Sequence, residues 1–388
     1  MLPQILHITE IVAVAATCFS LVYWAVCLCS AASYFHDRKV ELSDHRTDFL
    51  PPLSILKPLK GIDPEIYECL RSHCLQDYPD YEVLLGVSDP HDPSISHVEQ
   101  LQREFPRLSI RLLICRQILG ANVKVSNLAQ MLPEAKYEHL LVNDSDIRVQ
   151  PGYLQSVVAP LAAADIGLVT CLYRGVAGST LGARLESLGI GTDFSAGVLT
   201  AWRFEGIRFG LGSTLAFRKR DLQAVGGFSA LAGYLADDYQ LGRRIADSGL
   251  KVKLSSMVVE TLLPRYSLTG FFRHQIRWAR AVRDSRFWGY AGLGLTFGLV
   301  WAVAGLILAR GAAWAWWLLI AALILRVAVA LAVGRCVLQD RQIFPLLPLL
   351  PLRDAVAFFI WLASFFGHTV VWRGDRFRLR NGKLTRVG

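Results

Sequence analysis

Long apolar runs near both ends of the chain enclose a segment of mixed polar and apolar composition. The first run, Ile11 to Phe35, has no charged residue over 25 positions, which is enough for a tilted helix to cross a bilayer. Three further runs predict additional membrane helices towards the C-terminus: Phe287 to Ala309, Ala312 to Val333 (interrupted by Arg326) and Ala355 to Val371.

This pattern divides the chain into five expected segments. They are an N-terminal transmembrane anchor (1–35), a globular domain (36–266), an amphipathic helix at the membrane interface (267–286), a C-terminal transmembrane bundle (287–371) and a basic tail (372–388). Arg326 lies in the middle of an apolar run. It either faces the helix bundle in a structural role or contacts a lipid headgroup.

The composition agrees with a membrane protein. Hydrophobic residues make up 53% of the chain and charged residues 19%, with a mean hydropathy of +0.35. These values are too apolar for an ordinary soluble enzyme, and they exclude a disordered or collagen-like chain. Eight scattered cysteines without zinc-site spacing predict reduced thiols facing the cytosol.

Basic residues beside the apolar runs predict the orientation. Arg38 and Lys39 follow the first run, whereas no Lys or Arg precedes it. Because cytoplasmic loops carry the excess of Lys and Arg, the globular domain is predicted to face the cytoplasm. Three C-terminal spans would place the basic tail outside, unless the proline-rich stretch 343–352 is interfacial or re-entrant. Five arginines crowd the approach to the second run: Arg273, Arg277, Arg280, Arg283 and Arg286.

Short β-rich runs alternate with helical spacing in the globular domain. This alternation predicts a largely parallel α/β sheet, in which ligands bind beyond the carboxyl ends of the strands. The helical stretches are Pro64 to Leu75 and Pro93 to Phe105. The expected strands are Leu53 to Lys57, Tyr81 to Val87, Ser109 to Ile114, His139 to Asn143 and Gly167 to Tyr173.

Aspartates follow two of these expected strands. Asp89 comes after the second strand, and Asp144 and Asp146 come after the fourth. Two carboxylates one residue apart can hold a hard divalent cation that keeps positions open for phosphate oxygens. The same spacing is also common in ordinary turns, so the residues alone leave both interpretations open.

A second acidic pair, Asp237-Asp238, precedes a stretch with helical spacing. Carboxylates at a helix N-terminus cap the helix and interact favourably with its dipole. Asp238 has a second interpretation as a general base that takes a proton from an acceptor hydroxyl. Spacing alone favours the cap.

The segment from Ser267 to Tyr290 carries an apolar stripe at helical spacing and arginines on the other face. This is typical of an amphipathic helix in the membrane interface. Its arginines either attract anionic lipid or, with Arg277 and Trp278, line a diphosphate and acceptor site. Because the basic residues concentrate at the membrane boundary without a nucleic-acid-binding motif, a nucleic acid partner is excluded.

Taken in order, these motifs resemble those of the processive-type membrane glycosyltransferases of the GT-A fold. The pattern is Asp, Asp-x-Asp, (Glu/Asp)-Asp and (Gln/Arg)-x-x-Arg-Trp. The stretches SILKPLKGIDP, QDYPDYEVLLGVSDPHDP, DSDIRV, GSTLAFRK, LADDYQLG and WRGDRFRL are similar to the ceramide glucosyltransferase family and its bacterial relatives, including the hopanoid-associated glycosyltransferases. The resemblance extends from Leu53 through nearly the whole remaining chain. It implies a GT-A type α/β domain with one N-terminal and several C-terminal transmembrane helices.

The resemblance also implies a nucleotide-sugar site. Asp89 would bind the uracil end of a UDP-sugar, while Asp144 and Asp146 would hold Mg²⁺ or Mn²⁺ and the diphosphate. Lys57 and Asp63, near the first strand, become further candidate nucleotide contacts.

In the same way, the resemblance makes Asp238 the catalytic base and places Arg277 and Trp278 at the diphosphate and acceptor site. His274 stands where the family usually has Gln or Arg. A neutral or protonated imidazole can still donate a hydrogen bond to phosphate, so this departure does not exclude activity.

The implied reaction is an inverting transfer of a hexose from a UDP-sugar to a hydroxyl of a membrane lipid, with glucose and ceramide as the first expectation. A hopanoid acceptor, with UDP-N-acetylglucosamine or UDP-glucose as donor, is the main alternative. A polysaccharide synthase would need more spans for a translocation channel. A non-enzymatic lipid-binding protein would not need aspartates at all four motif positions.

Overall fold

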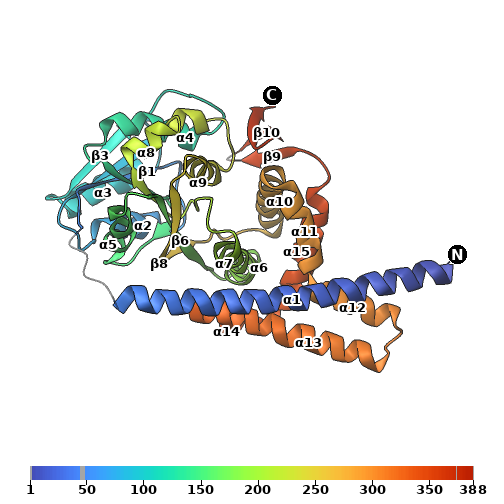
Figure 1. Cartoon of the computed structure of the whole chain (residues 1–388). Helices are drawn as coiled ribbons and strands as arrows, with labels where there is room; N and C mark the ends of the chain where they lie inside the picture. The colour runs from blue at the N-terminus through green and yellow to red at the C-terminus, as the bar shows by residue number, and fades with distance from the viewer. Residues whose placement is uncertain (1, 44–48, 373, 388) are drawn as a thin grey trace.

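An α/β domain sits on a set of long apolar helices in the computed structural model, which describes residues 2–43, 49–372 and 374–387 (Figure 1). Residues 1, 44–48, 373 and 388, which belong to the expected anchor, globular domain and tail, lie outside the described residues. The expected α/β class, with apolar helices at both ends of the chain, is confirmed.

The core of the domain is an eight-stranded sheet with the strand order β3-β2-β1-β4-β7-β6-β8-β5. The expected strands all form, each ending within three residues of the predicted bounds. The first half, β3 to β4, is parallel as predicted. The second half is mixed, because β7 runs antiparallel to both of its neighbours and β5 antiparallel to β8. The strands are β1 (Leu53–Pro58), β2 (Tyr81–Val87), β3 (Ser109–Ile114), β4 (His139–Val142), β5 (Ile147–Arg148), β6 (Ile166–Val176), β7 (Leu215–Arg218) and β8 (Lys251–Leu262).

Short amphipathic helices connect the strands and bury one face each against the sheet or against one another. In α9, for example, Leu241 and Ile245 lie four residues apart and are both buried, which is the spacing of one helix face. These helices are α2 (Ile66–Cys74), α3 (Ile95–Glu104), α4 (Val123–Met131), α5 (Tyr153–Val158), α8 (Lys219–Ala224) and α9 (Asp237–Asp247).

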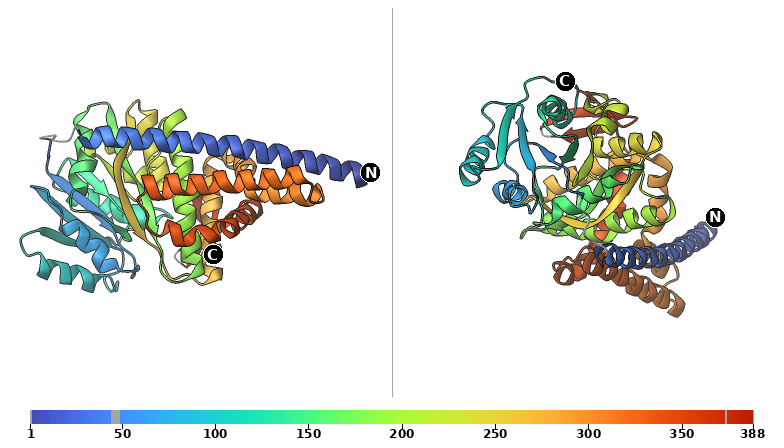
Figure 2. Two further views of the ribbon diagram at one scale, coloured as in Figure 1. Left: turned by 90° about the horizontal axis from the view of Figure 1, so that it is seen from below. Right: turned by 60° about the vertical axis from the view of Figure 1, so that its left-hand side comes forward.

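Long apolar helices run beneath the domain and beyond it. Figures 1 and 2 show α1 (Leu2–Ser43) and α13 (Ala313–Val329) side by side. Among the described residues, three helices are long and apolar enough to cross a membrane. They become four if α11 (Phe287–Gly292) and α12 (Gly298–Leu308), which a 50° bend separates, count as one span.

The last apolar helical span is shifted towards the N-terminus, running from Ile343 to Ser364 instead of the predicted Ala355 to Val371. The segment α15 (Leu350–Ser364) ends before Gly367, whose φ of +84° is a left-handed conformation that favours glycine and stops a helix. The prediction of one apolar span as far as Val371 is therefore wrong at its end, because β9 (Thr369–Trp372) begins there.

The C-terminal tail returns to the α/β domain. It forms a three-stranded antiparallel sheet from β9, β10 (Asp375–Arg380) and β11 (Lys383–Arg386). Backbone hydrogen bonds hold this sheet to the segment before α9, from Leu235 N to Gly382 O at 3.1 Å and from Leu384 N to Gly233 O at 2.7 Å. These bonds hold the tail against the α/β domain. In Figure 1, α15 rises steeply towards the α/β domain instead of lying along α13. This direction brings the tail next to the domain.

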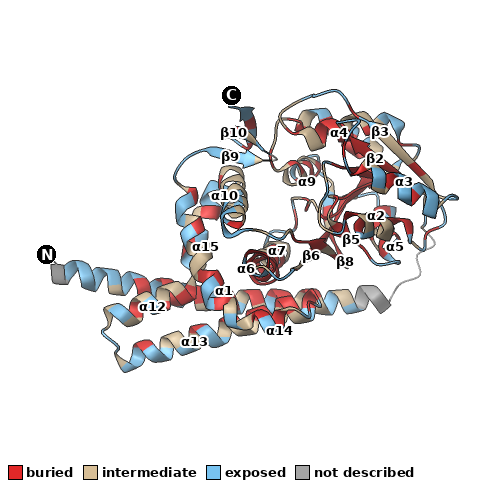
Figure 3. Cartoon of the chain, turned by 180° about the vertical axis from the view of Figure 1, so that it is seen from behind, coloured by how far each residue is buried: buried red, intermediate tan, exposed pale blue. Residues whose placement is uncertain are grey.

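A helical pair that the sequence analysis did not identify separates the sheet from the membrane helices. It consists of α6 (Leu181–Gly189) and α7 (Ser195–Phe204), joined by a π-helical segment. Figure 3 shows that both helices are largely buried. Their packing against β6, α1 and α15 places them at the junction between the α/β domain and the apolar bundle.

Arg326 in α13 is anchored inside the protein. Its guanidinium donates to Asp354 of α15 at 2.8 and 2.7 Å, and it also pairs with Asp193 of the α6–α7 connection. Only 2% of Arg326 is exposed. This geometry supports the structural interpretation of Arg326 rather than a lipid headgroup contact, because a buried charge of this kind needs its partners.

Candidate active site

The ends of β1 and β4 bring Lys57 and Asp144 together, because the two strands are parallel neighbours. Lys57 is fully buried, with its Nζ 3.1 Å from the backbone oxygen of Asp144 and 3.4 Å from Nε2 of His73. Burial lowers the pKa of Lys57 to about 8. Asp63, in the segment after β1, accepts a hydrogen bond from the hydroxyl of Ser145.

Asp144 and Asp146 form a crowded carboxylate pair. Asp146 Oδ2 accepts a hydrogen bond of 2.8 Å from Thr261 in β8. Burial and the charge of Asp144 raise the pKa of Asp146 to about 6. The two carboxylates supply hard oxygen ligands of the kind that a divalent cation prefers. No group of three or more His, Cys, Asp or Glu that could hold an ion occurs within the described residues.

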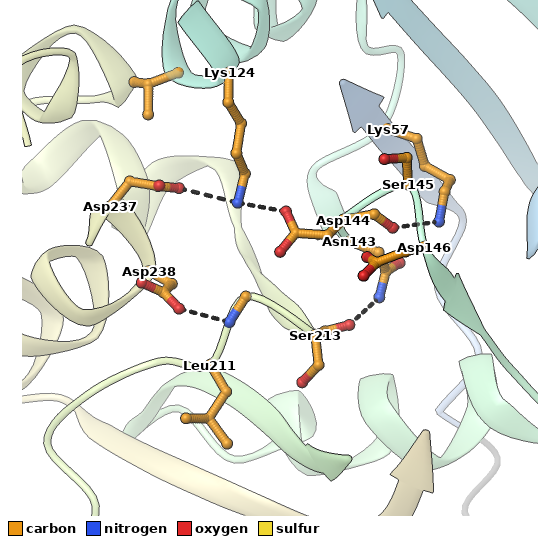
Figure 4. A network of polar contacts seen from close by, with 12 residues as sticks. Lys57, Lys124, Asn143, Asp144, Ser145, Asp146, Leu211, Ser213, Asp237 and Asp238 are labelled. Carbon is orange, nitrogen blue, oxygen red and sulfur yellow. Dashed lines mark hydrogen bonds and ion pairs between the residues drawn. The ribbon is translucent and has the colours of Figure 1, made fainter. Parts of the chain in front are cut away.

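Lys124 was missed by the sequence analysis. Its Nζ bridges the two acidic motifs, at 2.6 Å from Asp144 Oδ1 and 3.3 Å from Asp237 Oδ2, as Figure 4 shows. Burial alone would lower the pKa of Lys124, but the charges of Asp144, Asp237 and Asp238 raise it. The only local signal near it was Asn122, whose side chain accepts the N–H of Val125 and caps α4, and a helix cap does not identify a site residue.

Asp238 lies in the first turn of α9, as predicted, but its contacts extend beyond that helix. Oδ2 accepts the N–H of Gly212 at 2.7 Å, and Oδ1 accepts the N–H of Tyr239 at 2.8 Å. A Cβ added to Gly212 would lie 2.8 Å from Asp144 Oδ2 and 3.2 Å from Asp238 Oδ2. Both carboxylates thus face the same backbone position. Burial and the charge of Asp237 raise the pKa of Asp238 to about 6, against the opposing effect of Lys124.

Asp89 stands apart from this cluster. It follows β2 at the same sheet edge as Lys57, because β1 and β2 are parallel. Its side chain is exposed and accepts the backbone N–H of His91 at 2.8 Å.

The third motif lies on α10 (Leu268–Ser285), whose N-cap is Ser267. His274 stacks on Trp278 with ring centroids 5.9 Å apart, and its Nδ1 is 3.1 Å from the hydroxyl of Tyr266. Arg277 approaches the same Nδ1 to 3.5 Å. Burial and the positive charge of Arg277 lower the pKa of His274 to about 3. His274 is therefore neutral in this arrangement.

Tyr173 in β6 connects the third motif to the carboxylate cluster. Its ring packs against Phe194 at 5.2 Å, and Phe194 in turn contacts Trp278 at 6.2 Å. Burial raises the pKa of Tyr173, and so do the charges of Asp238 and Asp146. The structure thus gathers Lys57, Asp63, Asp144, Asp146 and Asp238 into one region, with His274, Arg277 and Trp278 beside it.

A match to the family described as glycosyl transferase family 21 covers residues 12–385. The chain belongs to this family. The resemblance seen in the motifs is therefore confirmed, and with it the expected GT-A type of fold. As a family 21 member, the chain contains all the motif residues described above within the matched range.

Curated relatives of this family 21 protein include ceramide glucosyltransferase 3 of Caenorhabditis elegans, which is 28% identical over 236 residues. That alignment covers 60% of this chain and 50% of the relative. The ceramide glucosyltransferase of Komagataella phaffii is 34% identical over 150 residues, covering 37% of this chain and 30% of the relative. The chain thus spans about half the length of the Caenorhabditis elegans relative and less than a third of the Komagataella phaffii relative.

Solved structures with a related arrangement are more distant. A mannosyltransferase from Pyrobaculum calidifontis, in complex with GDP-mannose and Mn²⁺, is 20% identical with a TM-score of 0.48, covering 90% of this chain and 99% of that chain. Residues 1–349 of TarS from S. aureus are 16% identical with a TM-score of 0.39, covering 86% of this chain and 98% of that chain.

Proposed function

We propose that this family 21 protein is an inverting membrane glycosyltransferase that moves glucose from UDP-glucose to the hydroxyl of ceramide. The observation that carries the proposal is the meeting of Asp144 and Asp238 at Gly212, with Asp146 two residues after Asp144, close to an amphipathic helix that leads into apolar segments. The names of the curated relatives support ceramide as the acceptor.

The donor would lie along the carboxyl ends of β1, β2 and β4. Asp89 would bind the uracil, with Lys57 and Asp63 supporting the nucleotide. Asp144 and Asp146 would hold Mg²⁺ or Mn²⁺, which neutralises charge on the diphosphate when bound. Lys124 and Arg277 supply further positive charge near the leaving group.

Asp238 would act as the base in a single displacement. The lipid hydroxyl oxygen attacks the anomeric carbon, the bond from that carbon to the diphosphate oxygen breaks, and the hydroxyl proton passes to Asp238. The raised pKa of Asp238, about 6, favours this role, because a general base is most effective near the working pH. Inversion follows from attack on the face opposite the UDP leaving group.

The acceptor would approach along α10, whose Trp278 is 41% exposed. Its tails would remain in the bilayer beside α15 while its polar end reaches Asp238. We further propose that the protein crosses the membrane several times with the α/β domain and the tail in the cytoplasm. The basic residues that flank α1 and fill α10 support this orientation.

The decisive experiment supplies purified protein with UDP-glucose or UDP-N-acetylglucosamine and with ceramide or a hydroxylated hopanoid, followed by mass spectrometry of the lipids. Glucosylceramide with inverted anomeric configuration is the expected product. A glycosylated hopanoid in place of glucosylceramide would replace the acceptor in this proposal, and no lipid glycoside from any pair would refute it.

A further inference from the structure

Buried polar atoms without hydrogen-bond partners gather around α6 and α7. Within the part of the chain that the structure describes, six of the ten such side-chain atoms occur here. Native proteins leave few buried polar groups unpaired, so a local concentration of them needs an explanation. The six are Glu186 Oε2, Asp193 Oδ2, Ser195 Oγ, His274 Nε2, and Nε and Nη1 of Arg353.

Glu186 and Arg353 are the central pair. Both side chains are ionisable, yet Glu186 is only 7% exposed and Arg353 only 8% exposed. A Cβ added to Gly189 would lie 2.3 Å from Nη2 of Arg353, so the guanidinium covers that glycine directly. Gly189 lies three residues after Glu186, on the same face of α6. The carboxylate of Glu186 and the guanidinium of Arg353 thus occupy one helix face.

The contacts of this pair leave specific atoms available. Arg353 Nη2 is 3.3 Å from Asp193 Oδ2, while Nε and Nη1 of Arg353 have no hydrogen-bond partner among the described residues. Glu186 Oε1 lies 3.3 Å from His274 Nε2, and the carboxylate also interacts with the hydroxyl of Tyr266, while Oε2 has no hydrogen-bond partner among the described residues. Arg353 therefore has two buried N–H donors without a hydrogen-bond partner among the described residues, and Glu186 has one such acceptor oxygen.

The position of the pair fits the path of a lipid acceptor. His274 connects Glu186 to Trp278 by ring stacking. An apolar cluster of Leu185, Phe271 and Ile360, from α6, α10 and α15, adjoins Glu186 along the chain. The pair therefore lies beside His274 and Trp278, at the junction of α6, α10 and α15.

The available atoms also specify the chemistry of a ligand. Nε–H and Nη1–H of Arg353 point to an oxygen acceptor such as an amide carbonyl, whereas Oε2 of Glu186 requires an O–H or N–H donor. An anionic headgroup is disfavoured, because Glu186 and Asp193 flank the guanidinium. We propose that Glu186 and Arg353 bind the polar end of the acceptor and select a lipid that carries an amide beside its hydroxyl. This inference rests on the proposed function and assigns its acceptor subsite.

The test measures initial rates of glucose transfer by Glu186→Gln and Arg353→Lys, which change hydrogen bonding at nearly constant size or charge. We expect KM for a short-chain ceramide to rise about 10- to 100-fold in each variant, the range for losing a hydrogen bond to a charged group. KM for UDP-glucose should stay within about twofold of the wild-type value. For a hydroxyl-only acceptor of the same chain length, Arg353→Lys should cause a smaller increase in KM.

Matched controls are available nearby. Arg184 is exposed on α6 and Glu205 is exposed just after α7, so Arg184→Lys and Glu205→Gln should leave both KM values unchanged. Unchanged ceramide KM in both test variants, or parallel increases in KM for ceramide and UDP-glucose, would overturn the inference.

A second readout separates this inference from the proposed function. Binding of radiolabelled short-chain ceramide is measured with the full-length protein in lipid nanodiscs. Loss of binding in Glu186→Gln, with retained UDP binding as evidence of folding, supports the subsite even if the wild-type protein transfers no sugar. Equal ceramide binding by wild type and Glu186→Gln would refute the proposed subsite. If Arg353→Lys does not fold, the result for Glu186→Gln alone decides whether the subsite exists.

Discussion

Replacing Asp238 by Asn separates its chemical role from its structural one. Each carboxylate oxygen accepts one backbone N–H, from Gly212 and Tyr239. Asn has one acceptor oxygen, so one of these N–H groups loses its partner, at a cost of about 1–3 kcal/mol if it stays buried. A second effect raises the stability of the variant, because Asn lacks the buried carboxylate whose ionisation opposes folding.

The raised pKa sets the size and direction of that second effect. The difference between about 6 and the usual 3.8 corresponds to about 3 kcal/mol. Because the pKa of Asp238 is raised in the folded state, the protonated carboxyl favours folding. Its contribution to the free energy of unfolding is fully present below pH 3.8 and is lost as the pH rises through about 6. The two effects nearly cancel at pH 7, so Asp238→Asn should melt close to the wild-type temperature. Its stability should also fall less than that of the wild type between these two pH values.

Catalysis should behave differently from stability. Loss of a general base lowers the rate roughly 10²- to 10⁴-fold, equivalent to about 3–5 kcal/mol of barrier. In the wild type, turnover should decrease as the pH falls below about 6, because the base becomes protonated. The assay follows glucosylceramide formation, with UDP affinity and thermal unfolding measured on the same preparations.

Asp237→Asn is the matched control for this experiment. Asp237 Oδ1 accepts a hydrogen bond from Asn122 at 3.2 Å, which the amide oxygen of Asn can preserve, and only the ion pair with Lys124 is lost. Its turnover should fall distinctly less than that of Asp238→Asn. A folded, UDP-binding Asp238→Asn protein with near-normal turnover would refute the catalytic role and leave Asp238 as the residue that holds the Gly212 segment.

Three further outcomes are expected. Lys124→Met should weaken UDP binding and raise the electrostatic repulsion between the acidic motifs; unchanged UDP affinity would show that this ammonium contributes nothing to the donor site. Chelation with EDTA should abolish turnover and Mg²⁺ or Mn²⁺ should restore it, whereas full activity in chelator would exclude the metal role. Arg326→Leu should cost about 3–5 kcal/mol of stability, since it strands Asp354, and adding Asp354→Leu should recover part of that loss in thermal unfolding; no recovery would contradict the ion-pair explanation.

Local patterns in the sequence determined much of the fold. The strands Tyr81–Val87 and Ser109–Ile114 form with the predicted bounds, because short β-rich runs between turn residues are local strand signals. The helix predicted over 267–286 forms as Leu268–Ser285, since its apolar stripe and Ser267 cap are both local signals. The motif order also identified the family.

Pairing between distant segments was decided only by the tertiary structure. The β7 strand is short and inserts antiparallel between β4 and β6, and spacing along the chain does not encode such a partner. The same holds for the tail, whose docking through Gly382 and Leu384 depends on the angle of α15. Lys124 gave no motif signal, because its significance comes from two carboxylates that follow it by 20 and more than 100 positions. Sequence periodicity reports which face of an element is buried, whereas the positions of charges relative to one another depend on how the elements pack.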